Sequence, residues 1–193
     1  MSQDRREQIV QAAREVVAEG GLEAVSVRTV ARRAGIGAST LRHYFPTQRD
    51  LYEEVLRPAL EHVVSDLHVE DRQLPPRARL HECLVQFIPR DYRDADTLSL
   101  WLASYAAAVG PNASESESRT LESLAALSRE RVDAWLAVLD EEGVLLLERG
   151  DALRLVLSVL DGICLQLLTP GAVVLPEHVE PTIAHVVAAI VRE

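Results

Sequence analysis

SVRTVARRAGIGASTLRHYF, residues 26–45, contains two short helical patterns separated by a pair of glycines. Apolar residues recur at helical spacing at positions 27, 30, 31 and 34, and Ser26 is of a type that often caps a helix. The segment Gly35-Ile36-Gly37 ends the first pattern, and a second short helix is predicted at about 38–45. Two short helices joined by a tight glycine-containing turn are typical of a helix-turn-helix.

The second helix of such a motif lies in the major groove of DNA, where each base pair presents its own pattern of donors and acceptors. That helix must be apolar toward its own core and small or polar on the opposite side. Leu41 and Phe45 supply the inward side here. The side chains left to face DNA are Ala38, Ser39, Thr40, Arg42, His43 and Tyr44.

The charge of the chain is distributed unevenly. Its formal net charge is −10, and all 20 basic residues are arginine. Residues 1–50 nevertheless hold eight arginines against six carboxylates, and residues 26–49 hold five arginines without a single Asp or Glu. We therefore expect an anion-binding surface on the helix-turn-helix, with a solvated arginine face as the alternative.

The sequence around this motif resembles the TetR family of bacterial transcriptional regulators. The resemblance covers about residues 5–63: an amphipathic first helix, the Gly20-Gly21 turn, then VSVRTVARRAGIGASTLRHYFPTQRDLYEEVL from residue 25. It implies a homodimer that binds double-stranded, palindromic operator DNA, and a repressor that a small-molecule effector releases. An activator or a ligand-independent regulator of the same family is the alternative.

The same resemblance implies roles for individual residues. Arg28 stands where family members contact the DNA backbone or a base, and Thr47 starts a helix whose N-terminus can meet a phosphate. Two positions depart from the family pattern. Arg42 stands where the family usually has a tyrosine, and Gln48 stands where a lysine commonly contacts phosphate. Arg42 can reach phosphate or pair with guanine. The expected DNA-binding residues are Arg28, Ala38, Ser39, Thr40, Arg42, His43, Tyr44 and Thr47.

The periodicity of the remaining chain predicts an all-α fold with about nine helices. Thr47 and Asp50 form a variant capping box that starts a helix near 47–68. Further helices are predicted near 77–88, 94–109, 116–142, 150–168 and 177–192. We divide the chain into a DNA-binding domain at 3–63 and a ligand-sensing and dimerisation domain at 64–193. The second domain resembles the C-terminal region of a betaine-regulator-type subgroup of the family.

The helix predicted at 150–168 is apolar on nearly all sides, so it must be covered by two neighbours. One neighbour can be its own domain and the other a partner chain, with a buried central helix of a monomer as the alternative. We expect a four-helix dimer interface made of Val156, Leu160, Ile163, Leu167, Ile183, Val187 and Ile190. The expected ligand-binding residues, for which plain core packing is the alternative, are Phe87, Trp101, Tyr105, Trp135 and Asp161.

Several other classes of protein are not favoured. The six histidines and two cysteines lack metal-binding spacing, and the absence of lysine excludes a P-loop or a Schiff-base enzyme. We expect no metal and no cofactor, and a helical enzyme or a plain interaction module are the rival classes. The first residues lack a signal-peptide pattern, and no apolar segment is long enough to span a bilayer. We therefore expect a cytoplasmic protein without a membrane partner.

Overall fold

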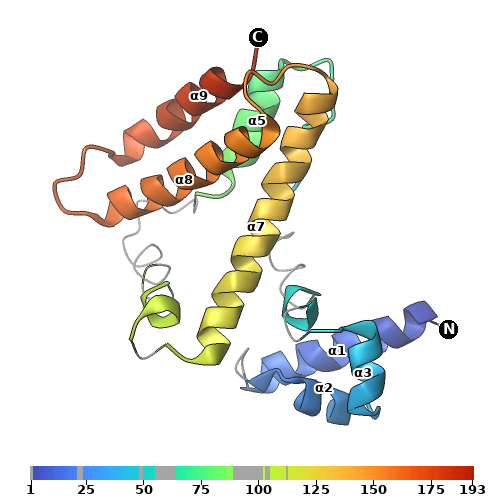
Figure 1. Cartoon of the computed structure of the whole chain (residues 1–193). Coiled ribbons are helices and arrows are strands. Elements are labelled where there is room, and N and C mark those ends of the chain that lie inside the picture. The colour runs from blue at the N-terminus through green and yellow to red at the C-terminus, as the bar shows by residue number, and fades with distance from the viewer. Residues whose placement is uncertain are drawn as a thin grey trace. The chain divides into compact units, whose positions relative to one another are not determined.

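The chain divides into two compact units in the computed structural model, which describes residues 2–20, 24–47, 50–54, 64–88, 102, 105–111 and 113–193. The first unit comprises Met1–Leu60 and Ser104–Leu127, and the second comprises Glu61–Ala103 and Ser128–Glu193. The sequence-based division at residue 63 does not include the return of the chain to the first unit at residue 104. Every regular element of the described ranges is a helix (Figure 1).

The first unit is built around three helices near the N-terminus. These are α1 (Ser2–Gly20), α2 (Val27–Arg33) and α3 (Ala38–Tyr44), and residues 50–54 are helical as well. The helix α2 packs against both α1 and α3. The long helix α7 (Glu115–Glu141) begins in this unit and continues into the second after Leu127.

The core of this first unit, which we call the head, holds the short helix α3 in place. Ile9 and Ala13 of α1, Val30 of α2 and Leu41 of α3 are completely buried in it. Burying a valine, leucine or isoleucine side chain stabilises a fold by about 1.5–3 kcal/mol. Helices of seven residues are too short to be stable alone, so this shared core fixes their mutual orientation.

The second unit, which we call the body, is also helical. It contains α5 (Pro76–Val85), α8 (Arg149–Leu168), the short 3-10 helix η2 (Pro176–His178) and α9 (Val179–Ile190). The helix α9 packs against both α5 and α8 (Figure 1). Among the described residues, pairing of the kind seen in sheets is confined to one isolated bridge between Leu145 and Val191.

The helix predicted at 47–68 does not extend to residue 68. Residues 64–66 are not helical, residues 67–70 form a turn, and residues 55–63 lie outside the described ranges. Leu67 has a φ of 43°, which is incompatible with a right-handed helix. The polar groups of Ser65 and Asp66 bind α5 and α7 instead of continuing a helical ladder.

None of the described helices combines the length and the apolar character needed to cross a bilayer. The described His, Cys, Asp and Glu side chains form no cluster of three that could hold a metal ion.

Cys83 and Cys164 are buried free thiols, and burial raises their pKa values to about 12 and about 11, so neither is a reactive thiolate at neutral pH.

Candidate nucleic-acid interface

The turn between α2 and α3 has the geometry that its sequence predicts. The Ser26 hydroxyl accepts a hydrogen bond from the Thr29 backbone N–H at 3.1 Å, and the Thr29 hydroxyl accepts one from the Ser26 N–H at 2.9 Å. Gly35 has a φ of 65°, a conformation that favours glycine. The Ile36 N–H then donates to the Ala31 carbonyl at 2.9 Å, which closes the turn. The predicted cap and the predicted break are both confirmed.

Side chains from neighbouring elements secure this motif. Gln8 of α1 donates to the carbonyl of Ala34 at 3.0 Å, so the C-terminal end of α2 has a partner from outside its own helix. The buried Tyr52 hydroxyl donates to the carbonyl of Val25 at 3.1 Å, just before α2 begins. The Arg6 guanidinium lies 5.0 Å above the centre of the Phe45 ring. These contacts fix both ends of the helix-turn-helix on the head.

The exposed face of α3 consists of the residues expected to read DNA. Leu41 and Phe45 are 0% and 1% exposed, which confirms the predicted inward face. Opposite them, Ala38, Ser39, Thr40, Arg42 and His43 are all exposed. Tyr44 is half-buried, packs against the head core, and has its ring edge-to-face with His43 at 5.3 Å between ring centres. Tyr44 therefore has a structural role in addition to any contact with DNA.

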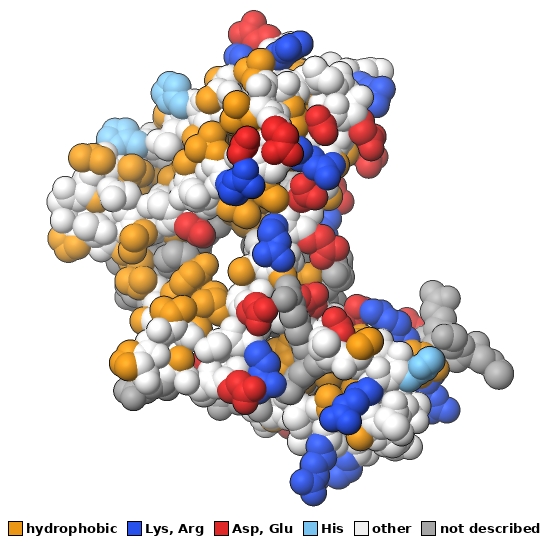
Figure 2. Space-filling view, in the orientation of Figure 1, with side chains coloured by type: hydrophobic (Ala, Val, Ile, Leu, Met, Phe, Trp, Pro, Cys, Tyr) orange, Lys and Arg blue, Asp and Glu red, His pale blue; other side chains and the backbone are white. Residues whose placement is uncertain are grey.

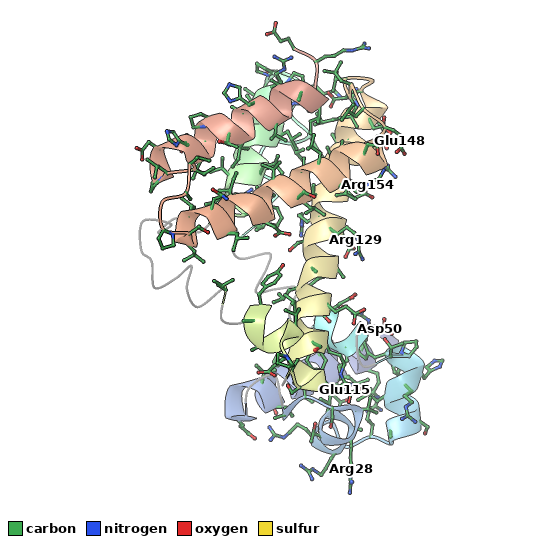
Figure 3. The ribbon with its side chains drawn as sticks, turned by 60° about the vertical axis from the view of Figure 1, so that its left-hand side comes forward. Arg28, Asp50, Glu115, Arg129, Glu148 and Arg154 are labelled. Atoms are coloured by element: carbon green, nitrogen blue, oxygen red, sulfur yellow. The ribbon has the colours of Figure 1, made fainter. Side chains whose placement is uncertain are left out.

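Residues 26–49 contain no carboxylate, yet one of their arginines is paired with carboxylates of another helix. Arg33 forms ion pairs with Glu19 and, at 3.4 Å, with Glu15, both on α1. Arg28, Arg32 and Arg42 are exposed, and the described carboxylates form no ion pair with them. Arg28 projects away from the helices into open space (Figure 3). Arginine side chains gather on the part of the head where α2 and α3 lie (Figure 2). Arg49 lies outside the described residues.

The start of the following helix has the capping box that its sequence predicts. Thr47 and Asp50 form the predicted capping box, since the Thr47 N–H donates to the Asp50 carboxylate at 2.8 Å and the Asp50 N–H donates to the Thr47 hydroxyl at 3.1 Å. The Thr47 N–H expected to meet a phosphate is thus already bound to an anion. A phosphate at this position would have to displace the Asp50 carboxylate.

The residues expected to bind a ligand are distributed over both units. Phe87 is half-buried and packs edge-to-face on the buried Trp135, with 5.8 Å between ring centres. Tyr105 belongs to the first unit, and Trp101 lies outside the described residues. Asp161 is exposed on α8, where partial desolvation raises its pKa. Only Phe87 and Trp135 are therefore brought into contact among the described candidates.

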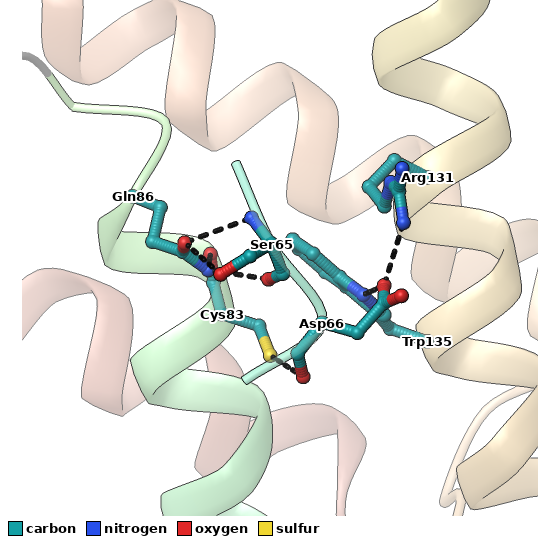
Figure 4. A network of polar contacts seen from close by, with 6 residues as sticks. All are labelled: Ser65, Asp66, Cys83, Gln86, Arg131 and Trp135. Atoms are coloured by element: carbon teal, nitrogen blue, oxygen red, sulfur yellow. Dashed lines mark hydrogen bonds and ion pairs between the residues drawn. The ribbon is translucent and has the colours of Figure 1, made fainter. Parts of the chain in front are cut away.

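Trp135 belongs to a polar network that sequence reasoning did not anticipate (Figure 4). Its indole N–H donates to the Asp66 carboxylate at 2.7 Å, and Arg131 donates to the same oxygen at 2.8 Å. The neighbouring Ser65 donates its N–H to the Gln86 side-chain oxygen at 3.0 Å, and the Gln86 amide donates back to the Ser65 carbonyl at 2.8 Å. We call Ser65 and Asp66 the anchor segment, because it is bound to both α5 and α7.

The residues expected at the dimer interface are placed mostly inside the body. Val156, Leu160 and Ile163 of α8 and Ile183, Val187 and Ile190 of α9 are at most 5% exposed within a single chain. Side chains that are already covered cannot lose more surface to a partner. They stabilise the contact of α8 and α9 with each other and with α5, and only Leu167 of the set is half-buried.

Comparison with known proteins places the head in a family. Residues 9–55 match the family described as bacterial regulatory proteins, tetR family. The transcriptional regulator PksA of Bacillus subtilis is 32% identical over 102 residues, which are 51% of this chain and 49% of PksA. BetI of Pectobacterium carotovorum is 28% identical over 110 residues, 54% of this chain and 55% of BetI. The chain therefore spans about half the length of the curated relatives it matches.

Similar solved structures extend over nearly the whole chain. A transcriptional regulator from Rhodococcus sp. Rha1 has a TM-score of 0.52 at 25% identity and covers 96% of this chain and 95% of its own. A TetR transcription regulator from Haloarcula marismortui has a TM-score of 0.56 at 21% identity and covers 98% and 100%. These likenesses confirm the all-α fold with a helix-turn-helix head. All four of these proteins are named as transcriptional regulators. Residues 9–55 of this chain therefore match the DNA-binding head of the TetR family of bacterial regulatory proteins.

Proposed function

We propose that this protein binds a palindromic operator as a homodimer through α3 and represses transcription until a small molecule releases it. The observation that supports it best is the exposed face of α3, which is mounted on a buried core and flanked by arginines that the described carboxylates leave unpaired. A rigid helix with small and polar side chains on its outer face suits the major groove. Repression and release by a ligand are inferred from the family.

Two kinds of DNA contact follow from this placement. Arg28 lies at the start of α2 and would contact a phosphate, which fixes the position of the head on DNA without reading sequence. Ser39, Thr40 and Arg42 would reach base edges, and an arginine can pair with both acceptors of guanine. The arginines Arg28, Arg32 and Arg42 would together supply the local positive charge that the acidic chain otherwise lacks.

Replacing Arg28 by Ala tests the phosphate contact. We expect the affinity to fall on operator and unrelated DNA alike, and the slope of log affinity against log salt to decrease by about one. Fluorescence anisotropy with labelled DNA from the region upstream of the gene, at several salt concentrations, measures both quantities. Arg129→Ala is the matched control, since Arg129 is an exposed arginine of α7 (Figure 3). Equal salt slopes for Arg28→Ala and the wild type would contradict the proposed contact.

The dimer would form through the uncovered sides of α8 and α9. On α8, Leu155 and Leu165 are 37% and 49% exposed. Gly162 lies on the same helix, and a Cβ atom at this position would have no neighbour within 4 Å, so another backbone can approach closely there. On α9 the exposed residues Ala184 and Ala189 are small as well. Two such faces from two copies would form the four-helix arrangement, with recognition helices about 34–36 Å apart.

Replacing Leu165 by Arg tests this choice of face. A charge buried between two copies without a partner should raise the dimer dissociation constant at least about tenfold, which sedimentation velocity over a range of concentrations detects. Val109→Arg is the control, because Val109 is 72% exposed and belongs to the first unit. Leu160→Arg should instead unfold the body, because Leu160 is buried. Unchanged dimerisation of Leu165→Arg would exclude this interface.

A further inference from the structure

A groove of about 560 Å³ opens on the body between α5, the beginning of α9 and the turn at Leu67. This volume lies within the range of small-molecule sites in proteins. Its apolar lining comes from Leu67, Val85, Ile88 and Val179. All residues of the groove belong to the body, and none of them is among the residues expected from the sequence to bind a ligand.

Leu67 is unusual in both its backbone and its side chain. It is the one residue other than glycine with a positive φ among the described residues, and its side chain is 49% exposed. A leucine in this conformation is strained, and residues of this kind cluster at sites that bind ligands. The strained turn holds an apolar side chain at the groove, where it is open to a molecule that enters.

The polar lining of the groove is acidic. Glu82 of α5, whose carboxylate also lies 3.2 Å from the His68 imidazole, and Glu180 of α9 are the acidic residues of the lining. His81 contributes an imidazole whose Nε2 lies 3.2 Å from the Glu180 carbonyl oxygen. No arginine lines the groove among the described residues. We propose that this groove is a binding site for an organic cation with an apolar body, with the carboxylates facing the charge and the apolar lining covering the rest.

The groove is directly connected to the anchor segment. Gln86 lines the groove and also holds Ser65 through three hydrogen bonds of 2.8–3.2 Å (Figure 4). Leu67 follows Asp66, whose carboxylate is bound by Trp135 and Arg131 of α7. A bound molecule that contacts Leu67 and Gln86 would therefore act on both sides of the anchor segment. This deepens the proposed function by naming the chemical class of the effector, and its effect on DNA binding rests on that function.

Tetraphenylphosphonium is a suitable probe, and the neutral triphenylphosphine oxide is its uncharged counterpart. We expect calorimetric titration to detect one cation bound per chain, and the neutral compound to bind more weakly. Glu82→Gln with Glu180→Gln should weaken cation binding about tenfold, since each exposed carboxylate contributes a few-fold. Asp140→Asn with Glu141→Gln removes the same charge from exposed positions on α7 and should leave binding unchanged. Val85→Arg, which fills the groove with a positive charge, should abolish binding.

Two results would overturn the site. One is that the wild type binds no cation, and the other is that the pair of substitutions in the groove and the control pair on α7 weaken cation binding equally. A second copy covering the groove would also prevent binding and would overturn the site. Binding to the probe is measured without DNA, so the two proposals fail separately. A chain that binds operator but no cation refutes the groove alone. A chain that binds the cation but no DNA at low salt refutes the proposed function alone.

Discussion

Thr40→Glu is expected to lower operator affinity about a thousandfold, close to the level of non-specific binding. Thr40 is exposed at the first turn of α3, next to the buried Leu41. A carboxylate at this position would face base acceptors and phosphates, so it would lose a contact and add repulsion. Anisotropy titration with upstream DNA at fixed salt measures the affinity. A reporter gene under the same upstream DNA should rise in expression if the protein is a repressor, and fall if it is an activator.

The control for this variant is Ala134→Glu, which adds the same charge at an exposed position of α7. Circular dichroism and sedimentation should give the same helix content and oligomeric state for both variants, because neither position is buried. Tyr44→Ala is a poorer test, because half of the Tyr44 side chain packs against the head core and its removal would also destabilise the head. If Thr40→Glu binds the operator as tightly as Ala134→Glu, α3 is not the recognition helix.

The head could be predicted from the sequence because its signals are local. A cap at Ser26, a break at Gly35 and the inward pair Leu41 and Phe45 each follow from residues within one or two turns. The capping box of Thr47 and Asp50 is equally local. The hydrogen bond that caps this helix also occupies the Thr47 N–H, so a phosphate there would compete with the Asp50 carboxylate.

Pairings across the chain could not be predicted in the same way. The segment 26–49 carries no carboxylate, yet Arg33 is neutralised by Glu15 and Glu19 of α1. Periodicity also indicates only that α8 is apolar on most sides. The position of α9 determines which side of α8 the body covers. Val156 and Leu160 are buried in the body, whereas Leu155 and Leu165 are exposed. The stripe that we expect at the dimer interface is therefore the stripe that packs inside the body.

The anchor segment had no sequence signal at all. Ser65 and Asp66 continue the polar and apolar pattern of the preceding residues, which favours a longer helix. Both residues instead form hydrogen bonds with side chains of other helices, namely Gln86, Arg131 and Trp135. Such a choice depends on groups up to 69 residues away in sequence, and local propensity does not contain that information.

Glu142→Gln is expected to destabilise the body by about 3 kcal/mol, because it leaves a buried charge without its counterion. Arg79 is 2% exposed and donates to the Glu142 carboxylate at 3.0 and 2.5 Å and to the Val69 carbonyl at 2.6 Å. Urea denaturation at fixed protein concentration measures the change. Arg72 provides the control, because its exposed guanidinium lies 3.5 Å from the same Glu142 carboxylate. Arg72→Met should lower the free energy of unfolding by less than about 1 kcal/mol.

The two partners of this pair should not be equivalent. Arg79→Met removes the buried charge itself and its unpaired Nε, while Glu142 keeps Arg72, so a smaller loss of about 1–2 kcal/mol is expected. The hydrogen bonds from Arg79 lower the pKa of Glu142 below the ordinary value of 4.5. The stabilisation from the pair is therefore fully present above pH 4.5 and is lost as the pH falls through the lower folded-state pKa.

The double variant Arg79→Met with Glu142→Leu separates a requirement for the charges from a requirement for filled volume. If desolvation of the two ions nearly offsets their attraction, an apolar pair of similar size should recover most of the stability lost in Glu142→Gln. The unfolding free energy of the double variant should then lie within about 1 kcal/mol of the wild type, and the part of its pH dependence that comes from Glu142 should be absent. A double variant less stable than Glu142→Gln would mean that the ions themselves hold Val69 and the end of α7 together.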